Sequence, residues 1–436
     1  MHLLPGRFLR NALPMKNFGL LIAVCCMLIG QLAAQSSFRQ TLRVDFSRCG
    51  NAELDSVAIE KMYFIRKNII SIDSMHMVDN INYGAYKIEV FSENGICLFR
   101  RGYSSMFNEW KTSDEAKTGF QYFEESVLIP WYSNMAKIVF SYRDKENVWH
   151  VQLTANIDNN AVSKTIIDIP EYPVKDFQIK GEPTQKLDIL FIPEGYTGEQ
   201  MDDFVIDCEN TIKYIMQSSP YKEFSNAISF RAVMAPSEES GTDFPQYDSL
   251  KNTLVNSTFN TFGTERYLTT FSYHKVMDVA SNAPADHVVI LVNTEDYGGS
   301  GFYNFYTMVA ANNMYSDFLI LHEMGHSLSG LADEYYTSDV AVQDFYSFEV
   351  EPWEPNITTL VDFSTKWDSL VTDTIPIPTP ARIIYRKLTG AFEGGGYSAT
   401  GIYRPAYNCT MKSVVYDGFC EACKAAIRRT ILWYSK

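Results

Sequence analysis

Hydrophobic and polar residues alternate with a period of two over about residues 38–168, which is typical of strands with one buried face. The apolar runs lie at residues 42–46, 86–91, 96–99, 127–129, 137–142 and 149–153. The second and third runs flank the sequence Ser-Glu-Asn-Gly, which is a signal for a hairpin turn. Several short strands with turn signals and few helices predict an all-β sandwich over residues 36–168. This part shows no group of residues typical of catalysis.

The pattern changes after residues 169–186, where three prolines among charged residues predict a linker. From residue 187 onward, short apolar strands alternate with segments whose apolar residues recur at helical spacing. We expect strands at residues 188–192, 228–234 and 288–292, and helices at residues 201–215 and 264–280. Strands that alternate with helices predict a mostly parallel α/β sheet over residues 187–436. The chain as a whole is therefore predicted to be α+β.

The first 35 residues have the pattern of an export signal. Basic residues precede an apolar run over residues 18–32, which ends in small residues before Gln35. This run is shorter than the ~20 residues that span a bilayer, so we expect a cleaved signal peptide at residues 1–35. The mature protein is predicted to be secreted, periplasmic or at the surface of a bacterial cell, with no membrane span. A lipid anchor on Cys25 or Cys26 is an alternative.

Composition narrows the possible partners. The chain has 436 residues, 46% of them hydrophobic, which suffices for two or three domains with cores of their own. It carries 37 basic and 52 acidic residues, a net charge of −15. Because binding to phosphates needs a basic surface, this balance excludes nucleic acid as the expected partner.

Cysteine usage fits an exported protein. Beyond the signal the chain has Cys49, Cys97, Cys208, Cys409, Cys420 and Cys423. Export permits disulfides and the even count fits pairing. Pairing within domains would join Cys49 to Cys97 and leave three connectivities for the others. In a second interpretation, the three C-terminal cysteines form a structural zinc site with Cys208; export favours disulfides.

The clearest chemistry lies in a His-Glu-x-x-His motif on a predicted helix. Ser316 suits the start of this helix and Gly330 its end. His322 and His326 lie one turn apart on the same face, so both imidazoles can bind one metal ion. A bound zinc ion lowers the pKa of its water to about 7, and Glu323 can accept the proton as that water attacks a carbonyl. A chance match is the alternative, expected in roughly one such chain in a hundred.

A catalytic zinc ion needs a third protein ligand and an open position for water. If Gly330 turns the chain back, either Asp333 or Glu334 reaches the metal. We favour Asp333, because carboxylate oxygen is a common zinc ligand and the turn presents this residue first. Glu334 is the alternative ligand, or it orients a histidine or the turn.

Five further segments, together with the histidine motif, are similar to those of a known family. They are residues 188–196, 392–397, 401–405, 408–413 and 419–423. Together with the histidine motif they resemble the M64 metallopeptidases, the IgA peptidases, within the metzincin-like zinc peptidases. The resemblance covers about residues 185–436, and the β-rich first half resembles the N-terminal domain often joined to this peptidase. One departure is that Gly330 and Asp333 each lie one residue further from His326 than in the general metzincin pattern.

The resemblance implies further roles. Met411 would belong to a Met-turn, a soft apolar platform beneath the metal-binding histidines. Residues 302–311 would form the edge strand that pairs with the substrate backbone. Tyr403 and Arg404 could line the cleft or hold a substrate carbonyl, and a purely structural role is the alternative.

The sequence thus predicts a secreted zinc endopeptidase, a hydrolase with one catalytic Zn²⁺ that acts on polypeptide or glycoprotein substrates. His322, His326 and Asp333 would hold the zinc ion, and Glu323 would act as base and then as acid. Specificity is expected to depend on loops near residues 297–306 and 337–405. One alternative is a host- or glycan-binding protein with a vestigial peptidase domain. Another is a metal-dependent amidase acting on cell-wall peptides.

Overall fold

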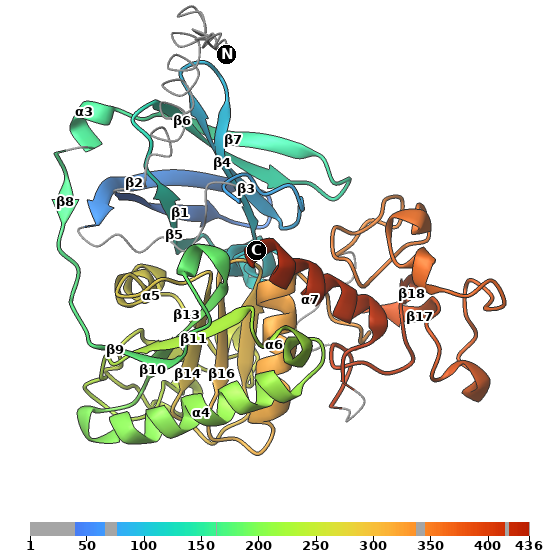
Figure 1. The fold of residues 1–436 in the computed structure, drawn as a ribbon. Helices are drawn as coiled ribbons and strands as arrows, with labels where there is room; N and C mark the ends of the chain where they lie inside the picture. Colours follow the sequence, from blue (N-terminus) through green and yellow to red (C-terminus); the bar gives the residue numbers. More distant parts are fainter. Residues whose placement is uncertain (1–39, 66–75, 163, 337–344, 415–417, 436) are drawn as a thin grey trace, which may run out of the picture. The chain divides into compact units, whose positions relative to one another are not determined.

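The structure is a computed structural model that describes residues 40–65, 76–162, 164–336, 345–414 and 418–435 (Figure 1). The predicted signal peptide and the alternative lipid anchor lie outside these residues. Within the described parts of the chain, no helix is both long and apolar enough to cross a membrane.

The N-terminal part consists of two four-stranded sheets, with strand orders β5-β1-β2-β8 and β4-β3-β6-β7. The strands are β1 (Thr41–Gly50), β2 (Asp55–Ile65), β3 (Tyr86–Ser92), β4 (Cys97–Tyr103), β5 (Gln121–Pro130), β6 (Met135–Arg143), β7 (Trp149–Asn156) and β8 (Ile166–Ile167). All neighbours are antiparallel except β2 and β8. The ring centroids of Phe46 on β1 and Phe140 on β6 lie 4.8 Å apart, so the two sheets pack face to face.

The second part is built on a six-stranded sheet of order β15-β16-β14-β10-β11-β9. Its strands are β9 (Val174–Gln178), β10 (Leu187–Glu194), β11 (Ile228–Val233), β14 (His287–Val292), β15 (Gly299–Phe302) and β16 (Tyr306–Ala310). The four central strands are parallel, and the two edge strands β9 and β15 are antiparallel to their neighbours. The predicted α+β fold, with a β region before an α/β domain, is confirmed. The segment expected as a linker includes β9, which joins this sheet.

The helices are α2 (Met106–Trp110), α3 (Asn159–Val162), α4 (Met201–Gln217), α5 (Tyr273–Ala280), α6 (Ser316–Ser329) and α7 (Glu421–Tyr434). Short 3-10 turns lie at Glu115–Lys117, Pro183–Gln185, Gly198–Gln200, Tyr221–Phe224, Pro245–Tyr247, Thr261–Gly263, Phe363–Thr365, Asp368–Leu370 and Ile383–Tyr385. Two small hairpins complete the fold, β12 (Ser257–Thr258) with β13 (Thr269–Thr270) and β17 (Phe392–Gly395) with β18 (Ser398–Arg404). The helix expected at 264–280 is therefore shorter, because its first half contains β13.

Helices α4, α6 and α7 share one hydrophobic core with the sheet (Figure 1). The sheet contributes alternate residues, such as Ile189 and Phe191 of β10, because successive side chains of a strand point to opposite faces. Leu319 and Met324 place α6 in the same core, and Cys208 of α4 is fully buried there. The core therefore fixes α6 against the edge of the sheet formed by β15 and β16.

Contacts between the two parts are specific. Arg43 on β1 is 1% exposed and forms ion pairs with Asp45 at 2.7 Å and with Asp278 of α5 at 2.5 Å. It also donates to the carbonyl oxygen of His274 at 3.0 Å. Glu109 of α2 accepts a hydrogen bond from the hydroxyl of Tyr267. Charged side chains of the β-rich part thus contact the α/β part of the chain.

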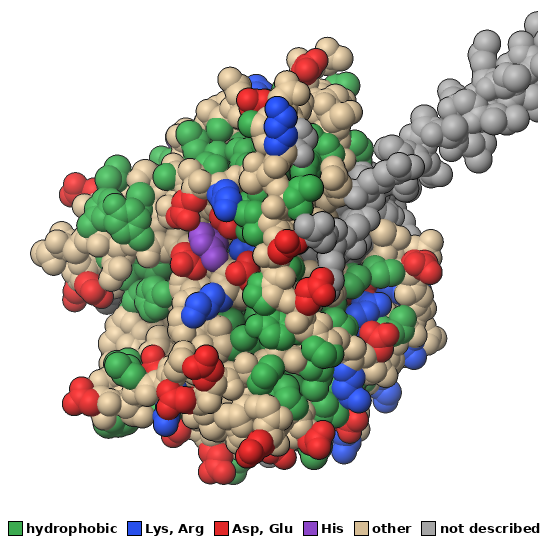
Figure 2. Space-filling model, turned by 90° about the vertical axis from the view of Figure 1, so that its left-hand side faces the viewer, with side chains coloured by type: hydrophobic (Ala, Val, Ile, Leu, Met, Phe, Trp, Pro, Cys, Tyr) green, Lys and Arg blue, Asp and Glu red, His purple; other side chains and the backbone are tan. Residues whose placement is uncertain are grey.

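The surface bears on the expected lack of nucleic-acid binding, and the cysteines bear on the expected disulfides. The face in Figure 2 carries scattered acidic and basic side chains with hydrophobic ones between them, and no continuous basic patch. All six cysteines of the described residues are free, so the expected disulfides are not formed. Cys49 lies on β1 and Cys97 on β4, in different sheets. Cys208 of α4 is buried in the same hydrophobic core as Cys409 and Cys423, but it does not belong to the group of close ligand atoms that includes the three C-terminal cysteines.

Candidate active site

Helix α6 carries the histidine motif. It begins at Ser316, whose hydroxyl donates to the carbonyl oxygens of Ala310 and Asn313 at 2.8 Å instead of capping the helix as expected. It ends at Gly330, which has a positive φ of 64°. Glycine adopts this left-handed conformation without a steric cost, so the chain turns back sharply toward the histidines.

The turn brings Asp333 to the two histidines. Its Oδ1 atom lies 3.1 Å from Nε2 of His322 and 3.3 Å from Nε2 of His326, and the two Nε2 atoms are 3.2 Å apart. Tetrahedral ligands at about 2.0–2.1 Å from one zinc ion lie roughly 3.3–3.4 Å from one another. The three atoms are therefore spaced as ligands of a single ion would be.

The other nitrogen of each ring is held by a backbone carbonyl. Nδ1 of His322 lies 2.9 Å from the oxygen of Thr410, and Nδ1 of His326 lies 2.6 Å from the oxygen of Leu331. A carbonyl only accepts, so each Nδ1 carries the hydrogen and each Nε2 keeps its lone pair for a metal. The other carboxylate oxygen of Asp333 accepts from the hydroxyl of Tyr397 at 2.6 Å.

The charges of His322, His326 and Asp333 shift one another's pKa values. Burial disfavours the charged form of His326, but the Asp333 carboxylate outweighs it and raises the pKa to about 9. Burial likewise opposes ionisation of Asp333, yet the two histidines hold its pKa far below the usual value. The buried carboxylate of Asp333 is therefore ionised beside the two imidazoles, as a metal ligand must be.

Glu323 lies beside the first histidine and lines the same pocket, which has a volume of about 270 Å³. Its side chain lies against Gly299 of β15: a Cβ atom on Gly299 would be 3.1 Å from Cγ and 3.2 Å from Oε1 of Glu323. Burial raises the pKa of Glu323, although the two histidines counteract this. A carboxylate with a raised pKa suits a group that accepts and returns a proton near neutral pH.

Met411 packs beneath the motif. It is fully buried, and its Sδ would lie 2.5 Å from a Cβ atom placed on Gly325, between the two histidines on α6. The backbone N–H of Glu334 donates to the Met411 carbonyl at 2.7 Å. Met411 thus packs against α6 at Gly325, and its role as a platform under the histidines stays a prediction.

Tyr403 and Arg404 do not line this pocket. Arg404 is buried and donates to the carbonyl oxygens of Glu393 and Gly394 at 2.6 and 2.5 Å, so it holds the β17–β18 hairpin. Glu334 points away from the histidines, toward the C-terminal cysteines. The edge strand next to α6 is β15, whereas β16, within the segment expected at the edge, lies inside the sheet.

Tyr297 and Tyr397 line the pocket from the loops that were expected to determine specificity. Other pocket residues have no local sequence signal, and these are Glu109, Thr264, Arg266, Tyr267 and Tyr335. Glu109 comes from the β-rich part, where no site residue was expected, and burial raises its pKa to about 7. Only the folded chain brings this carboxyl to the pocket of the two histidines.

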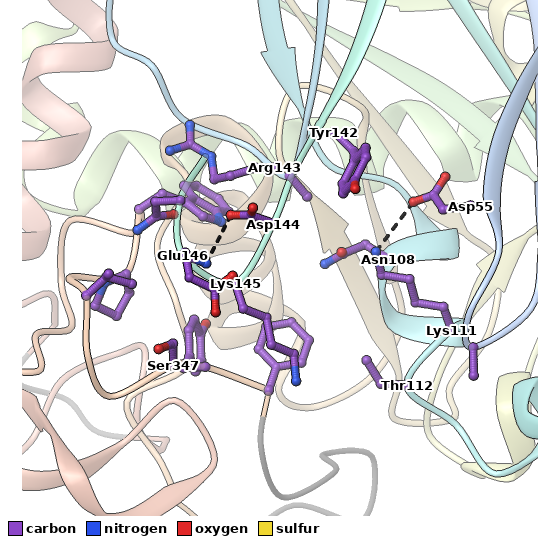
Figure 3. A pocket seen from close by; sticks show the side chains of 18 of the residues that line it. Asp55, Asn108, Lys111, Thr112, Tyr142, Arg143, Asp144, Lys145, Glu146 and Ser347 are labelled. Carbon is purple, nitrogen blue, oxygen red and sulfur yellow. Dashed lines mark hydrogen bonds and ion pairs between the residues drawn. The ribbon is translucent and has the colours of Figure 1, made fainter. Parts of the chain in front are cut away.

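A larger hollow of about 640 Å³ lies between the β-rich part and residues 345–353 (Figure 3). Asp55 and Lys111 form an ion pair at 3.4 Å on one side of it. Asn108 and Tyr346 line both this hollow and a smaller space that reaches His326 and Asp333. Among the described residues, neither of the two groups able to hold a metal lies in the hollow.

A helix that presents two histidines and a glutamate beside a mostly parallel sheet, with a carboxylate brought to them by a glycine turn, defines the class of metallohydrolases. The chain belongs to the IgA Peptidase M64 family: the family pattern matches residues 176–388 and 381–431. The pattern of the Peptidase M64 N-terminus matches residues 34–154. The predicted family membership is confirmed, and the protein is a peptidase of a metallopeptidase family. A search of curated proteins gives no match.

Proposed function

We propose that this protein is an exported zinc endopeptidase that uses His322, His326 and Asp333 as metal ligands. The single observation that carries the proposal is the convergence of three ligand atoms within 3.1–3.3 Å of one another. The buried Oδ1 atom of Asp333 faces the Nε2 atoms of the two histidines. Two imidazole nitrogens and one carboxylate oxygen form a donor set that suits Zn²⁺ and leaves one position open.

A zinc ion bound there would act as a Lewis acid on the scissile carbonyl and lower the pKa of a water molecule. Glu323 then accepts a proton from the attacking water, whose oxygen bonds to the carbonyl carbon. Glu323 returns the proton to the leaving nitrogen as the C–N bond breaks. The carboxylate lies in the space beside Gly299 that a larger side chain at this position would fill.

The shape of the site supports a polypeptide substrate. Gly299, Ser300 and Gly301 of the edge strand β15 line the pocket, so a strand backbone lies beside the metal ligands. An extended peptide can bind alongside such a strand through its main chain. The adjoining hollow lined by Asn108 and Tyr346 gives room for residues beyond the cleaved bond.

The proposal is tested by Glu323→Gln, which keeps the shape of the side chain but removes its basicity. We expect the variant to keep bound zinc and to lose at least about a hundredfold in activity on a diverse peptide mixture, the low end for general base catalysis. Glu209→Gln, at an exposed position of α4, is the matched control and should retain full activity. Full activity of Glu323→Gln would overturn the mechanism. Cleavage of cell-wall peptides alone would favour an amidase.

A further inference from the structure

Next to the catalytic site, four more side chains meet in a buried cluster. Glu334, Cys409, Cys420 and Cys423 each offer one ligand atom, and these atoms all lie within 4.8 Å of one another. We propose that this cluster is a second metal site, a structural zinc site with three thiolate ligands and one carboxylate ligand. It is separate from the histidine site, because Asp333 turns to the histidines and Glu334 to the cysteines.

The distances fit one ion better than a disulfide. Sγ of Cys409 and Sγ of Cys423 are 3.7 Å apart. Two sulfur atoms bound tetrahedrally at about 2.3 Å from zinc lie roughly 3.8 Å apart, whereas bonded sulfur atoms lie about 2.05 Å apart. Oε1 of Glu334 is 3.1 Å from Sγ of Cys423 and 3.9 Å from Sγ of Cys420. An oxygen and a sulfur ligand of one zinc ion are expected roughly 3.5 Å apart.

The backbone around the cysteines favours thiolates. Cys420 is the N-cap of α7 and Cys423 lies in its first turn, where the helix dipole stabilises negative charge. The N–H of Cys420 donates to Sγ of Cys409 at 3.3 Å, and the N–H of Cys423 donates to Sγ of Cys420 at 3.5 Å. These hydrogen bonds orient the sulfur atoms toward a common point.

A disulfide would not explain the buried carboxylate of Glu334. Its side chain is completely buried, and its Oε2 atom has no hydrogen-bond partner. Oε1 is shared between the amide of Asn356 at 3.1 Å and the sulfur atoms. Burying a carboxylate without a cation is costly, and a metal ion at the centre of the cluster would compensate for it. A disulfide between two of the cysteines would supply no positive charge.

The second ion would tie together the two segments that complete the catalytic site. Glu334 follows Asp333 directly, and Cys409 precedes Thr410, whose carbonyl orients His322. Met411 comes next and packs beneath α6. A metal bond from each segment would hold them in register, which is the usual role of a closed zinc site without an open position.

Metal analysis of the full chain tests this proposal. We expect about two zinc ions per chain in the wild type, about one in His326→Ala and about one in Cys423→Ser. Cys49→Ser changes a cysteine on β1 outside the cluster and should keep about two. If only the histidine site is wrong, His326→Ala keeps the wild-type content while Cys423→Ser loses an ion, so the two proposals fail separately.

Cobalt substitution gives a second readout that does not need the cysteine variant to fold. Co²⁺ bound by thiolates shows intense sulfur-to-metal charge-transfer absorption, which a site of two histidines and one aspartate lacks. We expect this absorption in the wild type and unchanged in His326→Ala. A disulfide among Cys409, Cys420 and Cys423, found by peptide mapping without reduction, would overturn the proposal. So would His326→Ala protein with no metal and no such absorption.

Discussion

Removal of the Tyr397 hydroxyl should weaken the catalytic metal site without touching a metal ligand. The hydroxyl donates to Oδ2 of Asp333 at 2.6 Å, while Oδ1 faces the two histidines. This hydrogen bond fixes the orientation of the carboxylate, and it gives the buried Oδ2 atom of Asp333 a hydrogen-bond partner. We therefore expect Tyr397→Phe to bind zinc less tightly.

The size of the effect follows from the kind of contact. A hydrogen bond to a charged group contributes about 1.5–3 kcal/mol, and loss of a partner that orients a metal ligand typically costs about 10–100-fold in affinity. A tenfold change corresponds to about 1.4 kcal/mol, so the two ranges agree. We expect the Kd for zinc to rise about 10–100-fold in Tyr397→Phe.

The assay is a competition titration of metal-free protein with a chelator of known zinc affinity. Tyr403→Phe is the matched control, since Tyr403 is a half-buried tyrosine on the β17–β18 hairpin and does not line the pocket. It should leave the Kd unchanged. Equal zinc affinity of Tyr397→Phe and wild type would refute the idea that the Tyr397 bond positions Asp333 as a ligand.

Three further predictions concern packing, pH and the contact between the two parts. Gly325→Ala places a Cβ atom 2.5 Å from Sδ of Met411. We expect this overpacking to lower the free energy of unfolding by about 1–3 kcal/mol and to lower activity. Unchanged stability and activity would contradict the platform role of Met411. Burial, with Arg101 adding to it, lowers the pKa of His287 to about 3, below its unfolded value. As the pH falls, the unfolded chain takes up this proton before the folded chain does, so the histidine should lower the free energy of unfolding by about 3 kcal/mol between pH 7 and pH 4. In pH-dependent denaturation, His287→Gln should lose less stability than the wild type over that range. Parallel curves of stability against pH for the two proteins would refute this. Arg43→Ala leaves buried Asp45 without its cation and should lower the free energy of unfolding by about 3 kcal/mol in urea titrations, whereas a loss below 1 kcal/mol would contradict the importance of this contact.

Local patterns predicted those site residues that lie on one element. His322, Glu323 and His326 share α6, and helical spacing alone places the two histidines side by side. The pattern could not separate Asp333 from Glu334, which are adjacent and chemically alike. In the structure they diverge where the N–H of Glu334 bonds to Met411, a contact with a distant segment.

Tertiary contacts also explain the differences in the fold. Strand β15 contains two glycines, which have low β propensity, so its residues give little strand signal. The expectation that residues 302–311 form the edge strand came from the family resemblance. That segment contains β16, which is buried along its whole length, as an inner strand should be. Thr269 and Thr270 form β13 within a segment of helical apolar spacing, since β-branched residues suit strands. Glu109 reaches the pocket only because the two parts pack together.

The cysteines show how composition can mislead. Their even number in a chain predicted to be exported favoured disulfides, but which cysteines meet depends on the fold. Cys208 lies on the buried face of α4 and shares the hydrophobic core with Cys409 and Cys423, but its sulfur atom is not among the ligand atoms that meet. Glu334 takes the place that Cys208 had in the alternative interpretation.

The central claim is that one zinc ion is held by His322, His326 and Asp333. An anomalous difference map, recorded at the zinc absorption edge from crystals of active protein, tests it most directly. The account predicts a peak within about 2.0–2.2 Å of Nε2 of both histidines and of Oδ1 of Asp333. A map of active protein with no zinc peak among these three atoms would contradict it.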